Sequence, residues 1–269
     1  MATTNLPRIL LLGANIANSA SVTIHQQLSA KFNKSYTYDI CELAENATIN
    51  ALTHIMLSSN LVGANVTNPF KRLFINNNYK LCPVAISTQA VNTIALKDGN
   101  FYATNTDVLG FKQSLAICEL NLAKQHVLVL GSGATALSVI YACQQLNISA
   151  ITIVGRNASA LNNLVTTCRK FLSAQVNLQA INASITRLDN NSLPDIIINT
   201  TSAGKYNCLP AYIAQLKLKD KIVFDVNYPP YNNLLAQYCT AQKVRRYIDG
   251  KTMLEQQAVA SFDFWFNAY

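Results

Sequence analysis

Short apolar runs alternate with longer segments of helical spacing along most of the chain. The runs have the length and bulky apolar composition of buried strands, which we predict at Ile9–Leu12, Tyr36–Ile40, Leu61–Val66, Val127–Leu130, Ile151–Val154, Ile196–Ile198 and Ile222–Val226. Apolar residues at helical spacing predict helices at Ser21–Lys31, Ala134–Leu146 and Ala158–Phe171. This alternation is typical of β-α-β units and predicts an α/β fold built on parallel sheets.

The length of the chain favours two domains. Its 269 residues exceed the commonest single-domain size of about 100–150 residues. The sequence has neither a low-complexity linker nor an internal repeat. A domain boundary must therefore be inferred from motifs.

The charge of the chain is positive but dispersed. The formal net charge is +8, and the densest basic stretches, Lys217–Lys221 and Lys243–Arg246, are not interleaved with aromatic residues. Nucleic-acid binding is therefore not expected, because it requires clustered phosphate contacts. The positive field would instead favour a small anionic substrate and a phosphorylated cofactor.

The cysteines do not form a disulfide pattern. Seven of them are scattered singly, at positions 41, 82, 118, 143, 168, 208 and 239. The odd number and the lack of C-x-x-C pairs predict reduced, mostly buried thiols. Since the sequence also shows no signal peptide and no apolar run of roughly 18 residues, we expect a cytoplasmic protein that does not enter a membrane.

A glycine-rich turn follows the predicted strand that ends at Leu130. Gly131 would make the tight turn, Gly133 would let the backbone approach a pyrophosphate, and the small Ala136 would allow close helix–strand packing. Backbone N–H groups at the helix start would then face the phosphates. The alternative is a strand–helix turn with a structural role only.

The end of the next strand bears on the choice of nucleotide. A NAD-specific site would place an acidic residue there, whereas this chain has Gly155-Arg156-Asn157. A guanidinium can bind a 2′-phosphate, so Arg156 favours NADP over NAD. The alternative is a solvent-exposed surface arginine.

Candidate catalytic groups follow a third strand. The segment Gly63–Lys71 begins as an apolar strand and ends in polar groups, a proline and a lysine, and sites are often assembled at the carboxyl end of a strand. An ammonium such as that of Lys71 can stabilise and protonate the oxygen of a ketone that is being reduced. As structural alternatives, Lys71 could begin an ordinary basic helix, Asp107 could cap a helix, and Ser19 and Ser21 could cap the first helix.

Several motifs occur in the order and at spacings similar to those of one enzyme family. They are N-V-T-x-P-x-K at Asn65–Lys71, V-N-T at Val91–Thr93, N-T-D at Asn105–Asp107, and the segments Ser19–Ser21, Asn199–Gly204, Asp225–Pro229 and Asp249–Gln257. Together they span nearly the whole chain. The sequence thus resembles the shikimate dehydrogenase family.

The resemblance implies a fold, an activity and partners. Residues 1–105 plus 249–269 would form an α/β substrate-binding domain, residues 106–248 would form a Rossmann-type NADP-binding domain, and a C-terminal helix would return to the first domain. The activity would be the reversible, NADPH-dependent reduction of 3-dehydroshikimate to shikimate, on the pathway to chorismate and aromatic amino acids. The partners would be this small-molecule substrate and NADP, with no nucleic acid and no membrane, in a monomer or homodimer.

The resemblance also implies roles for residues at matching positions. Lys71 and Asp107 would be catalytic. Substrate would be bound by Ser19, Ser21, Asn65, Thr67, Asn92, Tyr228 and Gln257. The cofactor would be bound by Gly131, Ser132, Gly133, Ala134, Thr135, Arg156, Thr200, Thr201, Ser202, Val226 and Gly250. No metal is expected, because the three histidines lack the spacing of metal ligands.

Some positions depart from the family pattern. Residues that the family usually has as glycine, proline, histidine or a basic residue are here Asn15, Asn18, Val22, Val108, Ala134 and Ala160. Two alternatives follow: a relative that accepts quinate or uses NAD, and a non-catalytic relative that binds a nucleotide or a small acid for regulation. The paired serines favour shikimate, and the retained Lys71 and Asp107 favour an enzyme.

Overall fold

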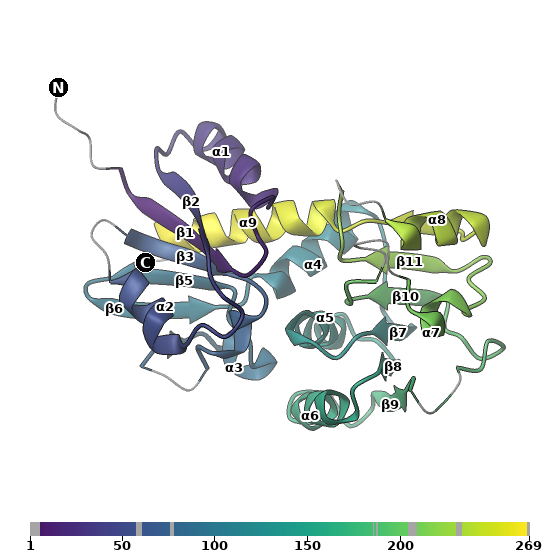
Figure 1. Ribbon diagram of the computed structural model, residues 1–269. Helices are drawn as coiled ribbons and strands as arrows, with labels where there is room; N and C mark the ends of the chain where they lie inside the picture. Colours follow the sequence, from purple (N-terminus) through teal and green to yellow (C-terminus); the bar gives the residue numbers. More distant parts are fainter. Residues whose placement is uncertain are drawn as a thin grey trace. The chain divides into compact units, whose positions relative to one another are not determined.

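The computed structural model describes residues 6–57, 61–75, 78–184, 186, 188–203, 209–229 and 233–267. Their contacts divide the chain into two compact units, Met1–Gly110 with Leu254–Tyr269 and Phe111–Met253. The predicted boundaries, after residues 105 and 248, lie a few residues before these. The chain passes from one unit to the other within helix α4 (Asp107–Ile117) and again within helix α9 (Lys251–Phe266) (Figure 1).

The first unit is built on a mixed sheet with the strand order β2-β1-β3-β5-β6-β4. Strand β1 is parallel to both of its neighbours, whereas β5 is antiparallel to β3 and to β6. The strands are β1 (Arg8–Gly13), β2 (Thr37–Glu42), β3 (Leu61–Val66), β4 (Lys80–Leu81), β5 (Thr93–Lys97) and β6 (Asn100–Thr104). The helices that begin in this unit, apart from α4, are α1 (Ser21–Lys31), α2 (Ile49–Met56), the short 3₁₀ turn η1 (Phe70–Arg72) and α3 (Pro83–Thr88).

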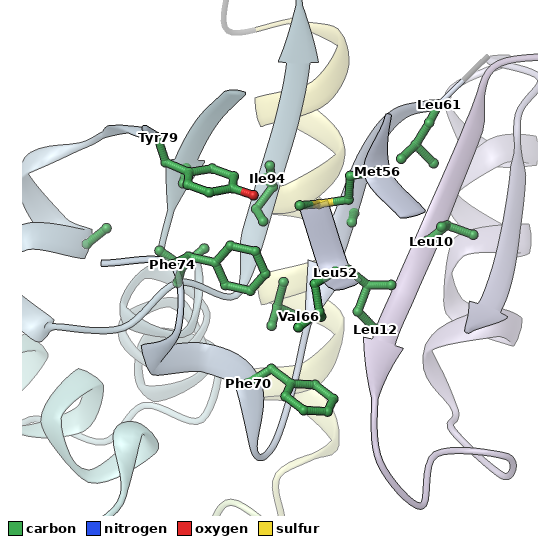
Figure 2. Close-up of a cluster of buried hydrophobic side chains, with 14 residues drawn as sticks. Leu10, Leu12, Leu52, Met56, Leu61, Val66, Phe70, Phe74, Tyr79 and Ile94 are labelled. Carbon is green, nitrogen blue, oxygen red and sulfur yellow. The ribbon is translucent and has the colours of Figure 1, made fainter. Parts of the chain in front are cut away.

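Strand β1 is buried on both faces of this sheet, and its side chains alternate between the two faces. Leu10 and Leu12 of β1 pack in one cluster with Leu52 and Met56 of α2 (Figure 2). Their neighbours Ile9 and Leu11 pack on the opposite face, in a cluster that contains Leu28 of α1 and Phe262 of α9. This explains why the strand is a continuous apolar run rather than an alternating one.

The second unit contains a parallel sheet with the strand order β12-β11-β10-β7-β8-β9. Its strands are β7 (His126–Leu130), β8 (Ala150–Gly155), β9 (Asn177–Asn182), β10 (Ile196–Asn199), β11 (Ile222–Asp225) and β12 (Arg246–Ile248). Its helices include α5 (Ala134–Gln145), α6 (Ala158–Cys168), α7 (Ala211–Ala214) and α8 (Leu234–Ala241). This is the doubly wound order of dinucleotide-binding folds, in which ligands bind where the order reverses, here between β7 and β10.

The fold-class prediction is confirmed, since helices and strands alternate in both units and the second unit has a Rossmann-type sheet. All seven predicted strands and all three predicted helices are present; helix α6, predicted to reach Phe171, ends at Cys168. The strands β5 and β6 were not predicted, although the Asp98-Gly99 turn between them is a hairpin signal. Both turn residues have positive φ, 49° and 71°, as a type I′ turn requires. Strand β9 was missed because none of its residues is buried and they form no apolar run.

The prediction of mostly buried thiols holds for three of the six described cysteines, since Cys41, Cys82 and Cys118 are only partly buried. Burial raises the pKa of Cys143, Cys168 and Cys239 to about 12 in each case. Cys208 and Gly204, which the sequence singled out, lie outside the described residues. No helix among the described residues is long and apolar enough to cross a membrane.

His25 of α1 is enclosed by aromatic rings and is 1% exposed. Its ring stacks on Tyr38 at a centroid distance of 4.0 Å and lies 5.3 Å from the ring of Trp265. Its Nδ1 atom is 3.0 Å from the Tyr36 hydroxyl. Burial lowers the pKa of His25 from 6.5 to about 3, because a charged imidazole would lose its hydration there.

We expect this imidazole to make stability depend on pH. As the pH falls below 6.5, the unfolded chain binds a proton at His25, which the folded chain does not bind until about pH 3. The contribution of His25 is therefore fully present above pH 6.5 and is lost as the pH falls, by at most about 1.4 kcal/mol per pH unit. In His25→Phe, which keeps a flat ring in the stack, that part of the slope should disappear.

Urea unfolding at a series of pH values between these limits measures the slope. The control is His54→Gln, which changes an exposed histidine and should retain the wild-type slope. An unchanged slope in His25→Phe would contradict the prediction.

Candidate active site

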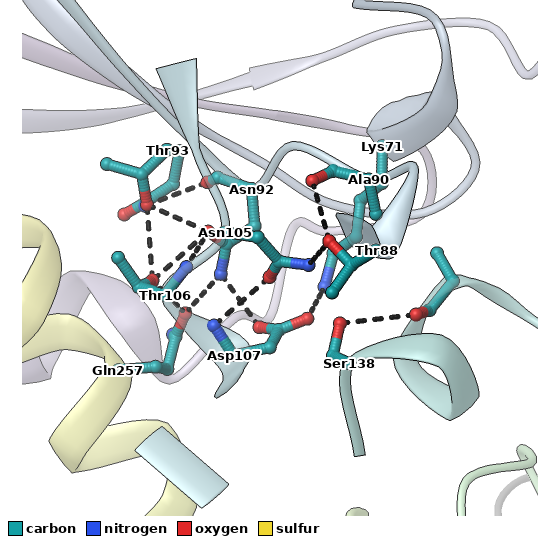
Figure 3. Close-up of polar contacts among 12 residues, drawn as sticks. Lys71, Thr88, Ala90, Asn92, Thr93, Asn105, Thr106, Asp107, Ser138 and Gln257 are labelled. Atoms are coloured by element: carbon teal, nitrogen blue, oxygen red, sulfur yellow. Dashed lines mark hydrogen bonds and ion pairs between the residues drawn. The ribbon is translucent and has the colours of Figure 1, made fainter. Parts of the chain in front are cut away.

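An ion pair lies at the carboxyl end of β3 in the first unit (Figure 3). The Lys71 Nζ atom is 2.6 Å from Asp107 Oδ2, and the two side chains are only 14% and 7% exposed. Lys71 is presented by η1, and Asp107 is the first residue of α4, where a negative charge interacts favourably with the helix dipole. Because water is largely excluded, the two charges interact more strongly than a surface pair would.

Asn92 completes the surroundings of the carboxylate. Its Oδ1 accepts hydrogen bonds from the backbone N–H and the hydroxyl of Thr106, at 2.7 and 3.1 Å. These donors fix the orientation of the amide, so Nδ2 donates to Asp107 Oδ1 at 2.7 Å and to Gln257 Oε1 at 3.0 Å. Gln257 is thereby oriented with its amide nitrogen as the end that can meet a ligand, and this end offers only donors.

Asn65, predicted to bind substrate, lies behind this site and is 6% exposed. Its Oδ1 accepts from the Tyr38 hydroxyl at 2.9 Å, and its Nδ2 donates to the Asn92 backbone oxygen at 3.0 Å. The amide is thus occupied inside the protein on both sides. The geometry favours a supporting role for Asn65 over direct contact with substrate.

The predicted residues Ser19, Ser21 and Thr67 follow the strands β1 and β3. These two strands are parallel neighbours, so the loops after them lie at the same edge of the sheet, and Ala14 N donates to Asn68 O at 3.2 Å between the loops. The Ser19 hydroxyl accepts from the backbone N–H of Ser21 at 3.3 Å, at the start of α1. This contact lies within the turn before α1, whose N-cap is Ala20 without a side-chain hydrogen bond, so it does not cap the helix. Substrate binding by these residues stays a prediction.

The glycine turn of the second unit lies between β7 and α5, as predicted. Gly131 has φ of +118°, and a Cβ atom there would lie 2.5 Å from Thr200 Oγ1. Gly133 precedes α5, which begins with Ala134 and Thr135, and a Cβ on Gly133 would meet nothing within 4 Å. One side of the turn is therefore packed against β10 and the other is open to a ligand.

A cavity of about 570 Å³ adjoins this turn. Of the predicted cofactor residues it brings together Gly131, Ser132, Arg156 and Thr201. Its other lining residues are Gly155, Asn157, Ser184 and Tyr212. Arg156 carries the only formal charge among these lining residues, and its backbone oxygen accepts from the Ser184 hydroxyl at 2.9 Å. The residues present suit a nucleotide with an anionic group next to Arg156.

Asp225 is a fully buried carboxylate that orients the loops after β10 and β11. It accepts from the side chains of Asn199, Asn227, Asn233 and Tyr247 at 2.8 to 3.0 Å. Burial raises the pKa of this carboxyl, and the hydrogen bonds act in the opposite direction. Asn199 in turn accepts from the backbone and hydroxyl of Thr201, so the network fixes part of the cavity wall.

The remaining predicted residues line neither the cavity nor the ion pair. Thr200 donates its hydroxyl to the Leu130 backbone oxygen at 2.7 Å, which joins β10 to β7. Gly250 lies so close to the Val226 backbone that a Cβ would have no space. Ser202 and Tyr228 follow β10 and β11 in the second unit.

Several residues that surround the two sites were not predicted. Asn157 could have been found, since it directly follows Arg156 and caps α6 by accepting from Ala160 N at 2.9 Å. Ser184 and Tyr212 lie in a turn and a four-residue helix without a sequence pattern. The support of Asn92 by Thr106 also required the fold.

Comparisons with known proteins place the sequence among known families. The family model described as shikimate dehydrogenase substrate binding domain matches residues 11–94, and the one described as shikimate / quinate 5-dehydrogenase matches residues 113–244. A curated shikimate dehydrogenase (NADP(+)) of Prochlorococcus marinus (strain MIT 9515) is 32% identical over 275 residues, which cover 99% of this chain and 94% of that protein.

Two solved structures share the fold. The structure of shikimate dehydrogenase from Aquifex aeolicus has a TM-score of 0.85 at 23% identity, and the match covers 100% of this chain and 95% of that one. Quinate dehydrogenase from Corynebacterium glutamicum in complex with NAD has a TM-score of 0.81 at 21% identity, with 96% and 93% covered. At these identities the likeness concerns the fold alone.

We expect Gly131→Ala to destabilise the protein by about 2–3 kcal/mol. The new methyl group would overlap Thr200 Oγ1, and its residue would hold a φ that side chains rarely adopt. Gly133→Ala is the matched control, because its methyl group enters open space, and it should cost under about 1 kcal/mol. Chemical denaturation of both variants measures the difference, and equal losses would contradict the prediction.

Proposed function

The chain belongs to the shikimate dehydrogenase family, and we propose that it reversibly reduces 3-dehydroshikimate to shikimate with NADPH, using Lys71 and Asp107 at the reacting oxygen. The observation that carries the assignment of residues is the nearly buried ion pair between Lys71 and Asp107. A regulatory relative without catalysis would have no need to keep these two charges together and away from water.

The ion pair suits both directions of the reaction. When a hydride reaches the ketone carbon, negative charge develops on the carbonyl oxygen. The ammonium of Lys71 stabilises this charge and donates a proton to the oxygen from Nζ. The oxidation of shikimate is the reverse transfer: Lys71 in its neutral amine form accepts the hydroxyl proton and becomes the ammonium that pairs with Asp107. The carboxylate of Asp107, 2.6 Å away, stabilises the charged lysine and limits its movement.

The neighbouring amides would orient the substrate ring. The amide nitrogen of Gln257 would donate a hydrogen bond to the oxygen of a ring hydroxyl. Both hydrogens of Asn92 Nδ2 already have acceptors, so contact with a substrate hydroxyl would replace one of them. For the substrate carboxylate we retain Ser19, Ser21 and Tyr228 as the proposed donors, and Thr67 for a ring hydroxyl.

The second unit would hold NADP(H), which supplies the hydride when bound. The open glycine turn at Gly131–Thr135 would receive the pyrophosphate through backbone N–H groups. Arg156 would bind the 2′-phosphate, and the lining of the 570 Å³ cavity fits this, because no carboxylate is among its residues. Thr200, Thr201, Ser202, Val226 and Gly250 stay proposed contacts for the remainder of the cofactor.

The proposed setting of the enzyme is the cytoplasm. Its product is an intermediate on the pathway to chorismate and aromatic amino acids. The buried thiols of Cys143, Cys168 and Cys239 are compatible with a reducing compartment. We propose a monomer or a homodimer.

We expect Lys71→Met to lower kcat by about a hundredfold to ten-thousandfold with a smaller change in the KM for shikimate. The variant keeps the volume of the side chain but removes the charge and the proton donor. The increase of reduced-nicotinamide absorbance, with shikimate or quinate and with NADP or NAD, measures turnover.

Lys80→Met is the control, because Lys80 is an exposed lysine of the same unit and its variant should have wild-type activity. No turnover by the wild-type protein with any of the four pairs would refute the dehydrogenase. Undiminished turnover by Lys71→Met would refute only the role of the lysine.

For Arg156→Gln we expect the KM for NADP to rise by about tenfold to a hundredfold, while the KM for NAD changes little. The guanidinium would donate charge-assisted hydrogen bonds to the 2′-phosphate of NADP, a group that NAD lacks. Arg169→Gln removes an exposed arginine of the same unit that does not line the cavity, and it should leave both constants unchanged. An equal rise of both KM values in Arg156→Gln would mean that the arginine contacts a part of the cofactor that NADP and NAD share.

A further inference from the structure

We infer that Ser261, on α9, is a positioning residue that orients Asn92 and Gln257 for the substrate. The inference rests on the proposed function, because it takes these two amides to be part of the substrate site. Sequence patterns give no reason to single out this serine.

The Ser261 hydroxyl joins separate segments of the first unit, and the residue is 0% exposed. Its Oγ lies 2.8 Å from the Thr93 hydroxyl and 3.1 Å from the Thr106 hydroxyl. It also accepts from Asn65 Nδ2 at 3.1 Å and donates to the Gln257 backbone oxygen at 2.9 Å. A single hydroxyl thus connects α9 to β3, to β5 and to the start of α4.

The hydrogens of these hydroxyls can be assigned. Since Ser261 has one hydrogen and gives it to the Gln257 oxygen, Ser261 Oγ acts as the acceptor towards the remaining partners. Each threonine hydroxyl also has one hydrogen. The Thr93 hydroxyl donates to Ser261 Oγ, its shorter contact, and the Thr106 hydroxyl donates to Asn92 Oδ1. Ser261 therefore fixes Thr93, whose hydroxyl lies 3.2 Å from the Thr106 hydroxyl that holds the Asn92 amide.

The orientation of that amide matters for the ion pair. If the Asn92 amide were turned over, its oxygen would face Asp107 Oδ1 and Gln257 Oε1, and three acceptors would meet without a hydrogen among them. Such an arrangement is unfavourable away from water. The two donors on Asn92 Oδ1, the backbone N–H and the hydroxyl of Thr106 at 2.7 and 3.1 Å, oppose this rotation.

Ser261 also acts on Gln257 along the helix. The two residues are one helical turn apart, and the hydroxyl binds the backbone oxygen of the residue that bears the substrate-facing amide. Loss of the hydroxyl would leave the Thr93 hydroxyl without its acceptor and would remove one of the three acceptors around Asn65 Nδ2. The affected groups all belong to the substrate side, so the cofactor constants should not change.

Ser261→Ala tests the inference, with Ser114→Ala as the matched control. Ser114 is also 0% exposed and lies in a helix, and its hydroxyl likewise donates to a backbone oxygen of its own helix, that of Phe111, at 2.7 Å. For Ser261→Ala we expect kcat/KM for shikimate to fall about tenfold, mainly through KM, while KM for NADP is unchanged. Ser114→Ala should lose thermal stability to a similar extent but keep wild-type kinetic constants.

A second pair of variants covers the case that Ser261→Ala does not fold. Thr93→Val replaces a hydroxyl of the same cluster by a methyl group of similar size and should show the same selective loss. Thr93→Ser keeps the hydroxyl and should restore kcat/KM. Wild-type kinetics in both Ser261→Ala and Thr93→Val would overturn the inference. Failure of both to fold would overturn it too, because the hydroxyls would then serve folding alone.

The inference and the proposed function fail differently. Absence of turnover by the wild-type protein would refute the proposed function. Equal rises of KM for shikimate and for NADP in Ser261→Ala, with an active wild-type protein, would refute the positioning role alone.

Discussion

A pair of opposite charges withdrawn from water is stable only where polar groups replace the lost hydration. The ion pair of Lys71 and Asp107 meets this condition, since the second carboxylate oxygen is bound by Asn92 and the charge stands at the start of α4. Asn92 in turn needs its own donors from Thr106, and this requirement spreads from the charge pair into the core. The buried polar residues of the first unit can therefore be understood as a chain of hydrogen bonds that begins at the Asp107 carboxylate and replaces its lost hydration.

In the second unit, the buried carboxylate of Asp225 also needs polar groups in place of its hydration. Its buried carboxylate is surrounded by four donor side chains, which come from segments next to the carboxyl ends of β10 and β11 and from β12. These contacts fix the loop that contains Thr201, at the place where the strand order reverses. In both units, then, a buried acid at the carboxyl edge of a sheet converts flexible loops into a defined site.

The sequence predicted the apolar framework and the charged groups, but not what joins them. Strand β1 is a continuous apolar run because both of its faces are buried, so its length and bulky apolar composition identified it. Lys71, Asp107 and Gln257 were identified because their motifs resemble a family. The supporting role of Asn65 was not predicted, because its partners Tyr38 and Ser261 are far away in the sequence. Tyr212 and Ser184 were missed for the same reason: short polar segments gain meaning only when the fold places them beside Arg156.

Helix α9 has a consequence for the order in which the protein can form during synthesis. The residues of the second unit leave the ribosome before Leu254–Tyr269, yet the first unit lacks Gln257, Ser261 and Trp265 until that segment arrives. Until then, Asn65 and Thr93 lack a partner from α9, and the Ile94 backbone oxygen lacks the indole N–H that binds it at 2.9 Å. The nucleotide-binding half can thus complete its sheet co-translationally. The polar groups of the first unit that bind α9 stay without these partners until the last helix has been synthesised.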